Sequence, residues 1–191
     1  AAIAGMDVPA ENQETAARRH AAKGVRETLA IATEYFESQL RMPVGREAME
    51  YLRGRGLDDL TIRRFRLGYS PSAQGSLAAG LGSDGIGQAQ LVDAGLMKMR
   101  DDGRVTDYFR DRIMFPITDR QGAVIAFGGR TLGDGQPKYL NSPETAVFQK
   151  SRVLYGLAQA REAAHKAGRV FVVEGYMDVI ALSQSGLAEA V

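Results

Sequence analysis

The sequence predicts an α/β protein: an α+β subdomain of helices with a small mixed sheet, followed by the first βα unit of a doubly wound sheet. Three observations lead to this prediction. Apolar residues recur at intervals of three or four up to about Gly95, short apolar runs separated by turn residues follow, and beyond Gly168 an apolar run precedes a second helical pattern. These patterns are typical, in turn, of amphipathic helices, of antiparallel strands and of a βα unit.

Five of the expected helices rest on apolar periodicity and on the residues that end each pattern. Pro43 ends the first, because proline cannot continue a helix. Asp58 or Asp59 caps the third, and Gly95 ends the fourth. The expected helices cover residues 14 to about 40, 46–53, 58–65, 88–94 and 157–167. The inward face of the first is Val25, Leu29, Ala32, Phe36 and Leu40.

Strands are expected where short apolar runs end at turn residues. Asp101-Asp102-Gly103 has the composition of a hairpin turn, and residues 119–122 join two longer strands. The expected strands cover residues 67–69, 96–99, 105 onward, 112–118, 123–127 and 170–173.

Residues 171–182, FVVEGYMDVIAL, carry the main functional signal. Continuous apolar residues before Glu174 are typical of a strand buried on both faces, and Met177, Ile180 and Ala181 after it share a helical face. Glu174 therefore lies at the carboxyl end of a parallel strand, where open α/β sheets bind ligands. A carboxylate there suits a divalent cation. The alternative from spacing alone is a solvated glutamate without a role.

A glycine pattern elsewhere does not predict a dinucleotide site. Residues 80–85, GLGSDG, fit G-x-G-x-x-G, but that fingerprint requires a preceding buried strand and a following helix. The residues before it, 76–79, have a helical pattern instead. We expect a glycine-rich surface loop, and the sequence also contains no P-loop motif.

Composition limits the class of protein. The net charge of +1 means that a nucleic-acid footprint must come from local clustering of cations. The absence of cysteine excludes disulfides and thiolate zinc sites, and His20 and His165 are too far apart for a histidine metal site. No apolar run approaches a membrane span, so we expect a soluble cytoplasmic protein without a membrane partner. The first residue is not Met and residues 188–191 resemble a strand beginning, so we expect a fragment.

Cations interleaved with an aromatic residue between positions 110 and 150 form a second signal. Arg110 and Arg112 are two apart, which in a strand places them on one face. Arg130 follows two glycines, which we expect to turn the backbone sharply and present its guanidinium. Such a pattern suits a single nucleic-acid strand, because cations track phosphates and a ring stacks on a base. The alternative is a set of solvated surface cations, since acidic residues occur in the same segment.

Several long motifs in order resemble those of the bacterial replicative DNA primases, the DnaG family. They are YFRDRIMFPI at 108–117, FGGR at 127–130, PKYLNSPET at 137–145, FQK at 148–150, LYGL at 154–157 and EGYMDV at 174–179. The last resembles the first signature of a TOPRIM domain, the Rossmann-like metal-binding fold of primases and topoisomerases. The resemblance runs from about Arg26 to Val191.

The resemblance implies which residues act. Glu174 and Asp178 would be catalytic and metal-binding, with the remaining metal ligands, a D-x-D pair, beyond Val191. A basic ridge would hold template, nascent RNA and ribonucleoside triphosphates. Its matching positions are Arg55, Arg110, Arg112, Arg130, Lys138, Tyr139, Asn141 and Lys150.

The resemblance also implies cofactors, partners and domains. The whole enzyme would use Mg²⁺ or Mn²⁺ for an in-line nucleotidyl transfer, and zinc only in a separate module. Residues 1–13 would be a linker from that zinc-binding module, 14–167 the basic-ridge subdomain and 168–191 the truncated start of TOPRIM. A replicative helicase would bind through a C-terminal module that this sequence lacks, placing the enzyme at the replication fork in the bacterial nucleoid.

The expected function is that of a DNA primase, a DNA-directed RNA polymerase that makes RNA primers on single-stranded DNA, with no turnover by this stretch alone. Two alternatives stay open: another TOPRIM enzyme, such as a topoisomerase or phage primase-helicase, and a noncatalytic module that binds single strands or nucleotides. A further hypothesis is that guanosine tetraphosphate-type alarmones compete at Arg112, Lys138 and Lys150.

Overall fold

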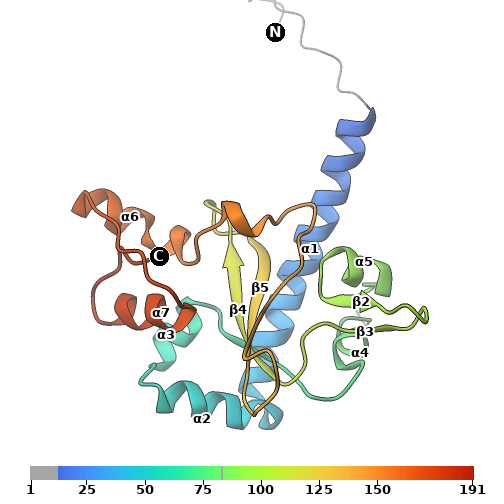
Figure 1. The fold of residues 1–191 in the computed structure, drawn as a ribbon, viewed down its shortest axis with the longest axis horizontal. Helices are drawn as coiled ribbons and strands as arrows, with labels where there is room; N and C mark the ends of the chain where they lie inside the picture. Colours follow the sequence, from blue (N-terminus) through green and yellow to red (C-terminus); the bar gives the residue numbers. More distant parts are fainter. Residues whose placement is uncertain (1–12, 83) are drawn as a thin grey trace, which may run out of the picture.

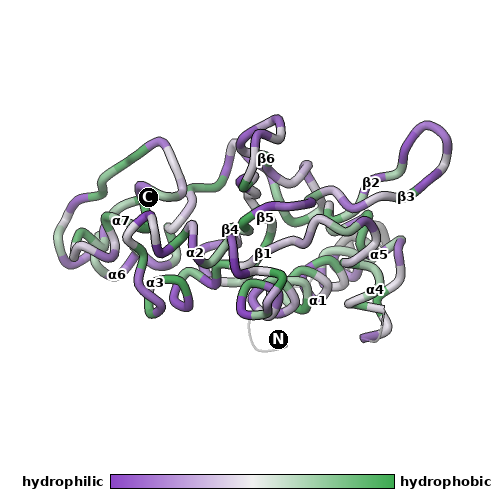
Figure 2. Tube along the Cα trace, turned by 90° about the horizontal axis from the view of Figure 1, so that it is seen from below, coloured by the Kyte–Doolittle hydropathy of each residue, from purple (hydrophilic) through white to green (hydrophobic). Residues whose placement is uncertain are grey.

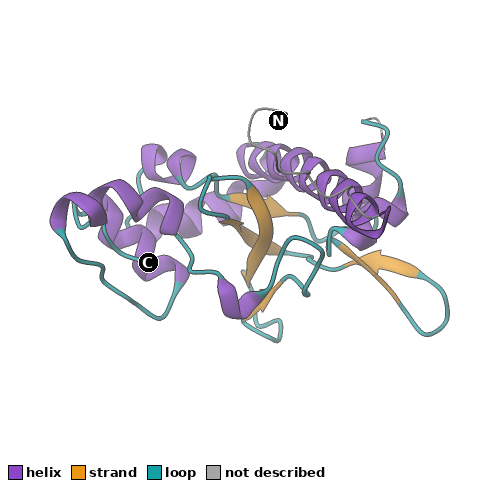
Figure 3. Cartoon of the chain, turned by 90° about the horizontal axis from the view of Figure 1, so that it is seen from above, coloured by secondary structure: helices purple, strands orange, loops and turns teal. Residues whose placement is uncertain are grey.

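The computed structural model describes residues 13–82 and 84–191 (Figure 1). The linker expected over residues 1–13 therefore lies almost wholly outside the described residues. Within them, helices surround a small antiparallel sheet, and a helical C-terminal part lies on the other side of that sheet from the longest helix (Figure 3). The α/β class predicted from the sequence is confirmed. No described helix is both long enough and apolar enough to span a bilayer.

Helix α1 (Gln13–Arg41) is the longest element, and the sheet packs against it. The five residues expected on its inward face are all buried: Val25, Leu29, Ala32, Phe36 and Leu40. Their spacing keeps one stripe of the helix against the sheet, so the periodicity predicted this helix correctly. The first turns of α1 extend past the body of the molecule (Figure 1).

A short turn and two helices follow α1, as expected. Residues Pro43–Gly45 form the 3₁₀ helix η1, and α2 (Arg46–Gly54) and α3 (Asp59–Arg64) come next. Asp58 caps α3, since its carboxylate accepts a hydrogen bond from the Thr61 backbone N–H at 2.6 Å. This acceptor satisfies one of the otherwise unpaired N–H groups at the start of the helix.

The central sheet has four strands in the order β1-β4-β5-β6. They are β1 (Gly68–Ser70), β4 (Arg112–Thr118), β5 (Val124–Thr131) and β6 (Tyr139–Asn141). We expected a mixed sheet, but each of the three pairings is antiparallel. The tight 119–122 turn explains the β4–β5 pairing, because a short connection can join only antiparallel neighbours.

Alternate residues of β4 face two different cores. Met114 packs in the cluster that contains Phe36 of α1, whereas Phe115 packs in the cluster that contains Met177 and Ile180 of α7 (Tyr176–Gln184). Every residue of β4 is buried. The strand is therefore the centre of the molecule, with α1 covering one face and the C-terminal part covering the other.

A separate lobe packs beside α1. It contains α4 (Ser76–Gly82), α5 (Gln88–Asp93), β2 (Met97–Met99) and β3 (Val105–Asp107). The β2–β3 hairpin projects from the body with a hydrophilic tip (Figure 2). The glycine-rich loop expected over 80–85 is partly wrong, because α4 continues through Gly82 and Gly80 packs against the ring of Tyr35. Gly80 thus serves the packing of α4 against α1, whereas nothing lies within 4 Å of a Cβ at Gly82 or Gly85.

The C-terminal part begins with η2 (Lys150–Arg152) and α6 (Leu157–Ala167), which ends at Gly168 with φ +64°. The strand expected over 170–173 forms only an isolated parallel bridge, between Phe171 and Ala190, and Val172 is 71% exposed. The predicted burial of residues 170–173 on both faces is therefore wrong. Among the described residues this segment pairs only with residues 189–191, so no sheet forms around it. On α7, Met177 and Ile180 are buried as expected, while Ala181 is exposed.

Candidate functional site

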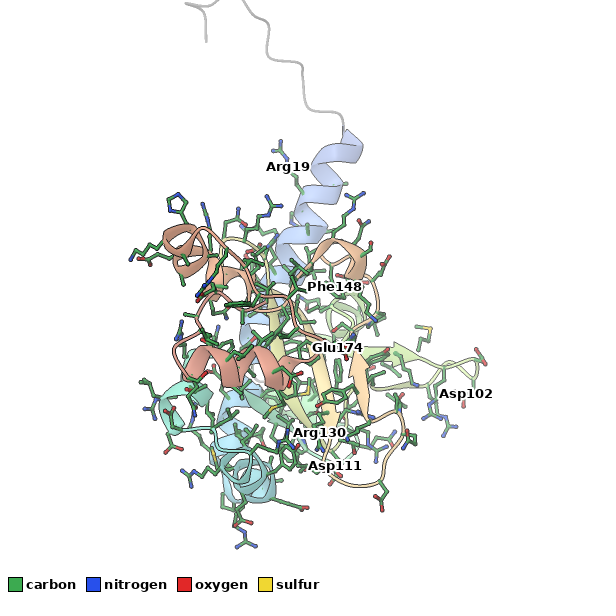
Figure 4. The ribbon with its side chains drawn as sticks, turned by 60° about the vertical axis from the view of Figure 1, so that its left-hand side comes forward. Arg19, Asp102, Asp111, Arg130, Phe148 and Glu174 are labelled. Atoms are coloured by element: carbon green, nitrogen blue, oxygen red, sulfur yellow. The ribbon has the colours of Figure 1, made fainter. Side chains whose placement is uncertain are left out.

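A groove of about 620 Å³ lies where β6, η2 and the start of α7 meet. It brings together five of the ten residues predicted for the site: Tyr139, Asn141, Lys150, Glu174 and Asp178. Its floor is apolar and includes Ile117 of β4 and Val173. The groove therefore combines two carboxylates, a cation, an amide and the half-exposed Tyr139 with apolar lining residues. Figure 4 shows the place of Glu174 in the fold.

The two carboxylates lie four residues apart, Glu174 just before α7 and Asp178 within it. Glu174 directly follows the 171–173 segment, whose backbone pairs with residues 189–191 in parallel through an isolated bridge in place of the predicted strand. Asp178 lies in the first turn of α7, and its N–H donates to the Gly175 carbonyl at 3.1 Å. Both side chains are exposed, and neither has a cation within ion-pair distance among the described residues. Both remain free to bind a ligand.

A metal site built wholly from described residues is absent, since no three His, Cys, Asp or Glu side chains cluster together among residues 13–82 and 84–191. Two free carboxylates still fit Mg²⁺, which commonly keeps several waters and binds through one or two carboxylates plus substrate phosphates. Glu174 and Asp178 are the groove residues with the required oxygen donors.

Strand β6 supplies the groove's aromatic and amide groups. Tyr139 and Asn141 are two apart and so share one face of the strand, and both line the groove. The ring of Tyr139 is 43% exposed. Asn141 Oδ1 accepts a hydrogen bond from the Tyr176 hydroxyl at 2.5 Å. Lys138, at the start of this segment, is exposed outside the groove lining.

Arg110 and Arg112 differ in environment, contrary to the expectation that they share a face. Arg112 is only 7% exposed, and its guanidinium donates to the carbonyls of Gly129, Pro137 and Lys138 at 3.1, 2.9 and 3.4 Å. Burial lowers the pKa of Arg112. Arg110 is exposed, and its Nε donates to the Ser72 carbonyl at 3.1 Å.

The backbone of Asp111 explains the difference. Its φ of +51° lies in the left-handed region, so the chain between the two arginines is not extended. Side chains two apart share a face only where the backbone is a strand. The Arg112 guanidinium consequently clamps β5 to the segment before β6, while Arg110 faces solvent.

The glycines before Arg130 have a different role from the one expected. Gly128 and Gly129 lie inside β5 and make no sharp turn. A Cβ on Gly128 would lie 2.5 Å from the Tyr176 ring, and one on Gly129 would lie 2.7 Å from the Phe109 ring. The missing side chains therefore let aromatic rings pack on both faces of the strand.

Two other predicted cations, Arg130 and Arg55, lie at α2 and outside the groove lining. The Arg130 guanidinium lies over the Tyr51 ring, 4.1 Å from its centroid, and donates to the Thr131 carbonyl at 2.7 Å. Arg55, one helical turn after Tyr51, is exposed at the end of α2. The structure thus places five of the ten predicted residues in the groove lining and the other five, Arg55, Arg110, Arg112, Arg130 and Lys138, outside it.

Sequence reasoning missed the aromatic residues that support the groove. Tyr176 stacks on Phe115 at 5.2 Å, and Tyr155 meets its edge at 4.6 Å. A local signal existed, because Tyr176 directly follows Glu174-Gly175 in the motif that carried the prediction. Its partners were not identifiable, since they lie on β4, β6 and the segment before α6.

Comparison with solved structures defines the class of protein. The chain is similar to a solved structure of the DnaG primase catalytic domain bound to ssDNA, with a TM-score of 0.83 and 42% identity over 90% of this chain and 56% of that one. It is also similar to a DNA primase domain from Pseudomonas aeruginosa, with a TM-score of 0.82 and 47% identity over 87% of this chain and 52% of that one.

Sequence comparison identifies the family. The model of the DNA primase catalytic core, N-terminal domain, matches residues 35–161, and the chain belongs to this family. It is 46% identical to the DNA primase of Pseudomonas putida over 100% of this chain, and 41% identical to that of Escherichia coli strain K12 over the same share. The chain spans 30% and 33% of these relatives. The resemblance to bacterial DNA primases is thereby confirmed.

Proposed function

We propose that this chain forms the front part of a primase RNA polymerase core, which makes short RNA primers on single-stranded DNA from ribonucleoside triphosphates. One observation carries the proposal. In a chain of the primase family, one groove holds two unpaired carboxylates beside a lysine, an amide and a half-exposed tyrosine ring. This set suits a divalent cation, a polyphosphate and a base at once.

Each groove residue has a distinct role in this proposal. Glu174 and Asp178 would hold Mg²⁺ or Mn²⁺ with further ligands from a longer polypeptide, and the metal when bound would clamp the reacting phosphate oxygens. Lys150 would neutralise phosphate charge, and Asn141 would donate a hydrogen bond. The exposed part of the Tyr139 ring would support a base or ribose.

In this proposal, four cations outside the groove lining would extend the groove into a track for nucleic acid. Arg55, Arg110, Arg130 and Lys138 would contact the phosphates of the template or the nascent RNA. We place the boundary between the basic-ridge subdomain and the TOPRIM start at residue 168. The zinc-binding module, the helicase-binding module and a location at the replication fork belong to the longer enzyme in this proposal.

Single-stranded DNA binding tests the track. In a salt series monitored by fluorescence anisotropy, four or five phosphate contacts give a plot of log K against log salt with a slope of about −3. Arg110→Ala is the informative variant, because Arg110 is exposed whereas Arg112 also supports the backbone. We expect Arg110→Ala to reduce the slope by about 0.7. Salt-independent binding by the wild-type chain contradicts the proposal.

One observation favours a second candidate, a binding module without turnover. The described residues contain no cluster of three metal-binding side chains. Primer synthesis assays with Glu174→Gln in a polypeptide as long as the primase relatives separate the two. Lost synthesis with retained DNA binding supports the polymerase, and an absence of synthesis by the wild-type protein supports the binding module.

The alarmone hypothesis needs a narrower set of contacts than the sequence suggested. The Arg112 guanidinium is occupied by three backbone carbonyls, so Lys138 and Lys150 are the cations available to a polyphosphate. Lys138→Ala should weaken binding of a ribonucleoside triphosphate and of guanosine tetraphosphate together. Loss of only one of the two contradicts a shared site.

A further inference from the structure

Tyr176 lines the groove, and its ring is closely packed against its neighbours. It stacks on Phe115 with an angle of 14° between the rings, and Tyr155 meets its edge at 74°. Gly128 leaves the space that the ring fills, because a Cβ there would lie 2.5 to 2.8 Å from three Tyr176 atoms. The position of the hydroxyl group is therefore set by packing on several sides.

This hydroxyl joins two parts of the groove. It donates to Asn141 Oδ1 at 2.5 Å, and so links the first residue of α7 to the last residue of β6. Burial raises the pKa of Tyr176 to about 12. The hydroxyl consequently keeps its proton, and its ability to donate, throughout the neutral pH range.

The contact fixes the orientation of the Asn141 carboxamide. A separation of 2.5 Å fits an O–H···O hydrogen bond and is too short for one that involves the amide nitrogen. The carbonyl oxygen therefore faces Tyr176, and the NH₂ group lies on the opposite side of the carboxamide. That NH₂ group has no hydrogen-bond partner among the described residues, and Asn141 lines the groove.

We propose that Tyr176 is a positioning residue, which holds the Asn141 carboxamide so that its NH₂ group donates to an oxygen of a bound ribonucleoside triphosphate. The inference deepens the proposed function and rests on it. In the reversed orientation, the amide oxygen would face the groove and repel a triphosphate. The hydrogen bond also ties the turn that bears Glu174 to β6, and so sets the carboxylates against the Asn141 and Lys150 side of the groove.

The same aromatic cluster provides a matched control. The Tyr155 hydroxyl is buried and has no hydrogen-bond partner among the described residues. Tyr155→Phe and Tyr176→Phe thus remove the same atom from neighbouring rings in one cluster, but only the second breaks a hydrogen bond. A difference between the two variants reports on that bond, since the ring packing is retained in both.

The test is a double-mutant cycle on nucleotide affinity. Binding of GTP with Mg²⁺ is measured for the wild-type chain, Tyr176→Phe, Asn141→Ala, the double variant and Tyr155→Phe, with folding checked by circular dichroism. We expect Tyr176→Phe and Asn141→Ala each to weaken binding by about two- to tenfold, the range of one hydrogen bond. The double variant should bind no more weakly than Asn141→Ala, and Tyr155→Phe should bind like the wild type.

Two results would overturn the inference. One is equal GTP affinity of Tyr176→Phe and Tyr155→Phe, whether or not both are weakened. The other is independent effects of Tyr176→Phe and Asn141→Ala that multiply in the double variant. Lys150→Ala separates this failure from that of the proposed function. If Lys150→Ala weakens GTP binding while the cycle fails, only the positioning role is wrong. If the wild type does not bind GTP, or Lys150→Ala binds as tightly as the wild type, the proposed groove itself is wrong.

Discussion

At the scale of single residues, the site depends on groups that lie behind it. Because Gly128 has no side chain, the Tyr176 ring can pack against it. The Arg112 guanidinium donates hydrogen bonds to three backbone carbonyls. Neither needs to touch a ligand to affect binding. Replacing such a residue changes the shape of the groove and the stability of the fold together, so the two effects have to be measured separately.

Gly128→Ala should destabilise the fold by about 1–3 kcal/mol, because the added methyl group overlaps the Tyr176 ring in a closely packed cluster. Urea denaturation measures the change in the free energy of unfolding. Gly133→Ala is the matched control, since nothing lies within 4 Å of a Cβ there and its φ is ordinary. Equal stability of the two variants would show that Tyr176 does not pack on β5 as described.

Arg112→Ala should lower the free energy of unfolding by about 2–4 kcal/mol, because it leaves three carbonyls without their charged donor. Arg110→Ala should change it by less than about 0.5 kcal/mol, since that side chain is exposed. Thermal or urea unfolding of both variants checks this. A stable Arg112→Ala protein would contradict the clamp, and a strongly destabilised Arg110→Ala protein would contradict its placement at the surface.

At the scale of elements, α1 organises the molecule. Phe36 on this helix meets Phe127 of β5 edge-on at 5.3 Å, and the main chain of β1 approaches so closely that a Cβ on Gly68 would overlap Phe36. The sheet that carries the site is thus positioned by one helical stripe. The apolar period of this stripe is visible in the sequence, whereas which strands it packs against is not.

Phe36→Ala should destabilise the fold by about 3–5 kcal/mol, the range for deleting a fully buried aromatic side chain. Glu34→Ala, on the exposed side of the same helix, should change stability by less than about 0.5 kcal/mol. Chemical denaturation of both proteins compares them. Similar losses in the two variants would mean that α1 does not present one face to the sheet.

At the scale of the whole molecule, buried tyrosines determine the response to alkaline pH. Burial raises the pKa of Tyr69, Tyr155 and Tyr176 above the ordinary value of 10.0, and that of Tyr176 reaches about 12. At pH values between the ordinary tyrosine pKa and the raised pKa of the folded state, the folded state binds more protons than the unfolded state. Stability therefore falls as pH rises through this range. The stabilisation is fully present below pH 10.

Because its pKa is higher in the folded state, Tyr176 alone should lower the free energy of unfolding by about 1 kcal/mol between about pH 10 and 11. Urea denaturation at several pH values from about 8 to 11 measures the slope. In Tyr176→Phe the slope should be shallower by that amount, because the variant has no proton to lose at this position. An unchanged slope would show that the Tyr176 hydroxyl is exposed to water.

Sequence by itself determined the helices, the main strands and the family, because apolar period, capping residues and long motifs are local properties. It also identified the ten candidate side chains, and five of them share one groove. It could not predict that Arg110 is exposed while Arg112 is buried. That difference depends on the left-handed backbone angle of Asp111, which is set by its surroundings.

Only the tertiary structure decided what supports the site. The Tyr176–Asn141 hydrogen bond joins residues 35 positions apart, and Gly128 accommodates a ring from an element nearly 50 positions later. Such contacts arise when strands and helices distant in sequence pack together, and no local pattern encodes their partners. Local chemistry thus determined which residues could act, and packing determined which of them meet.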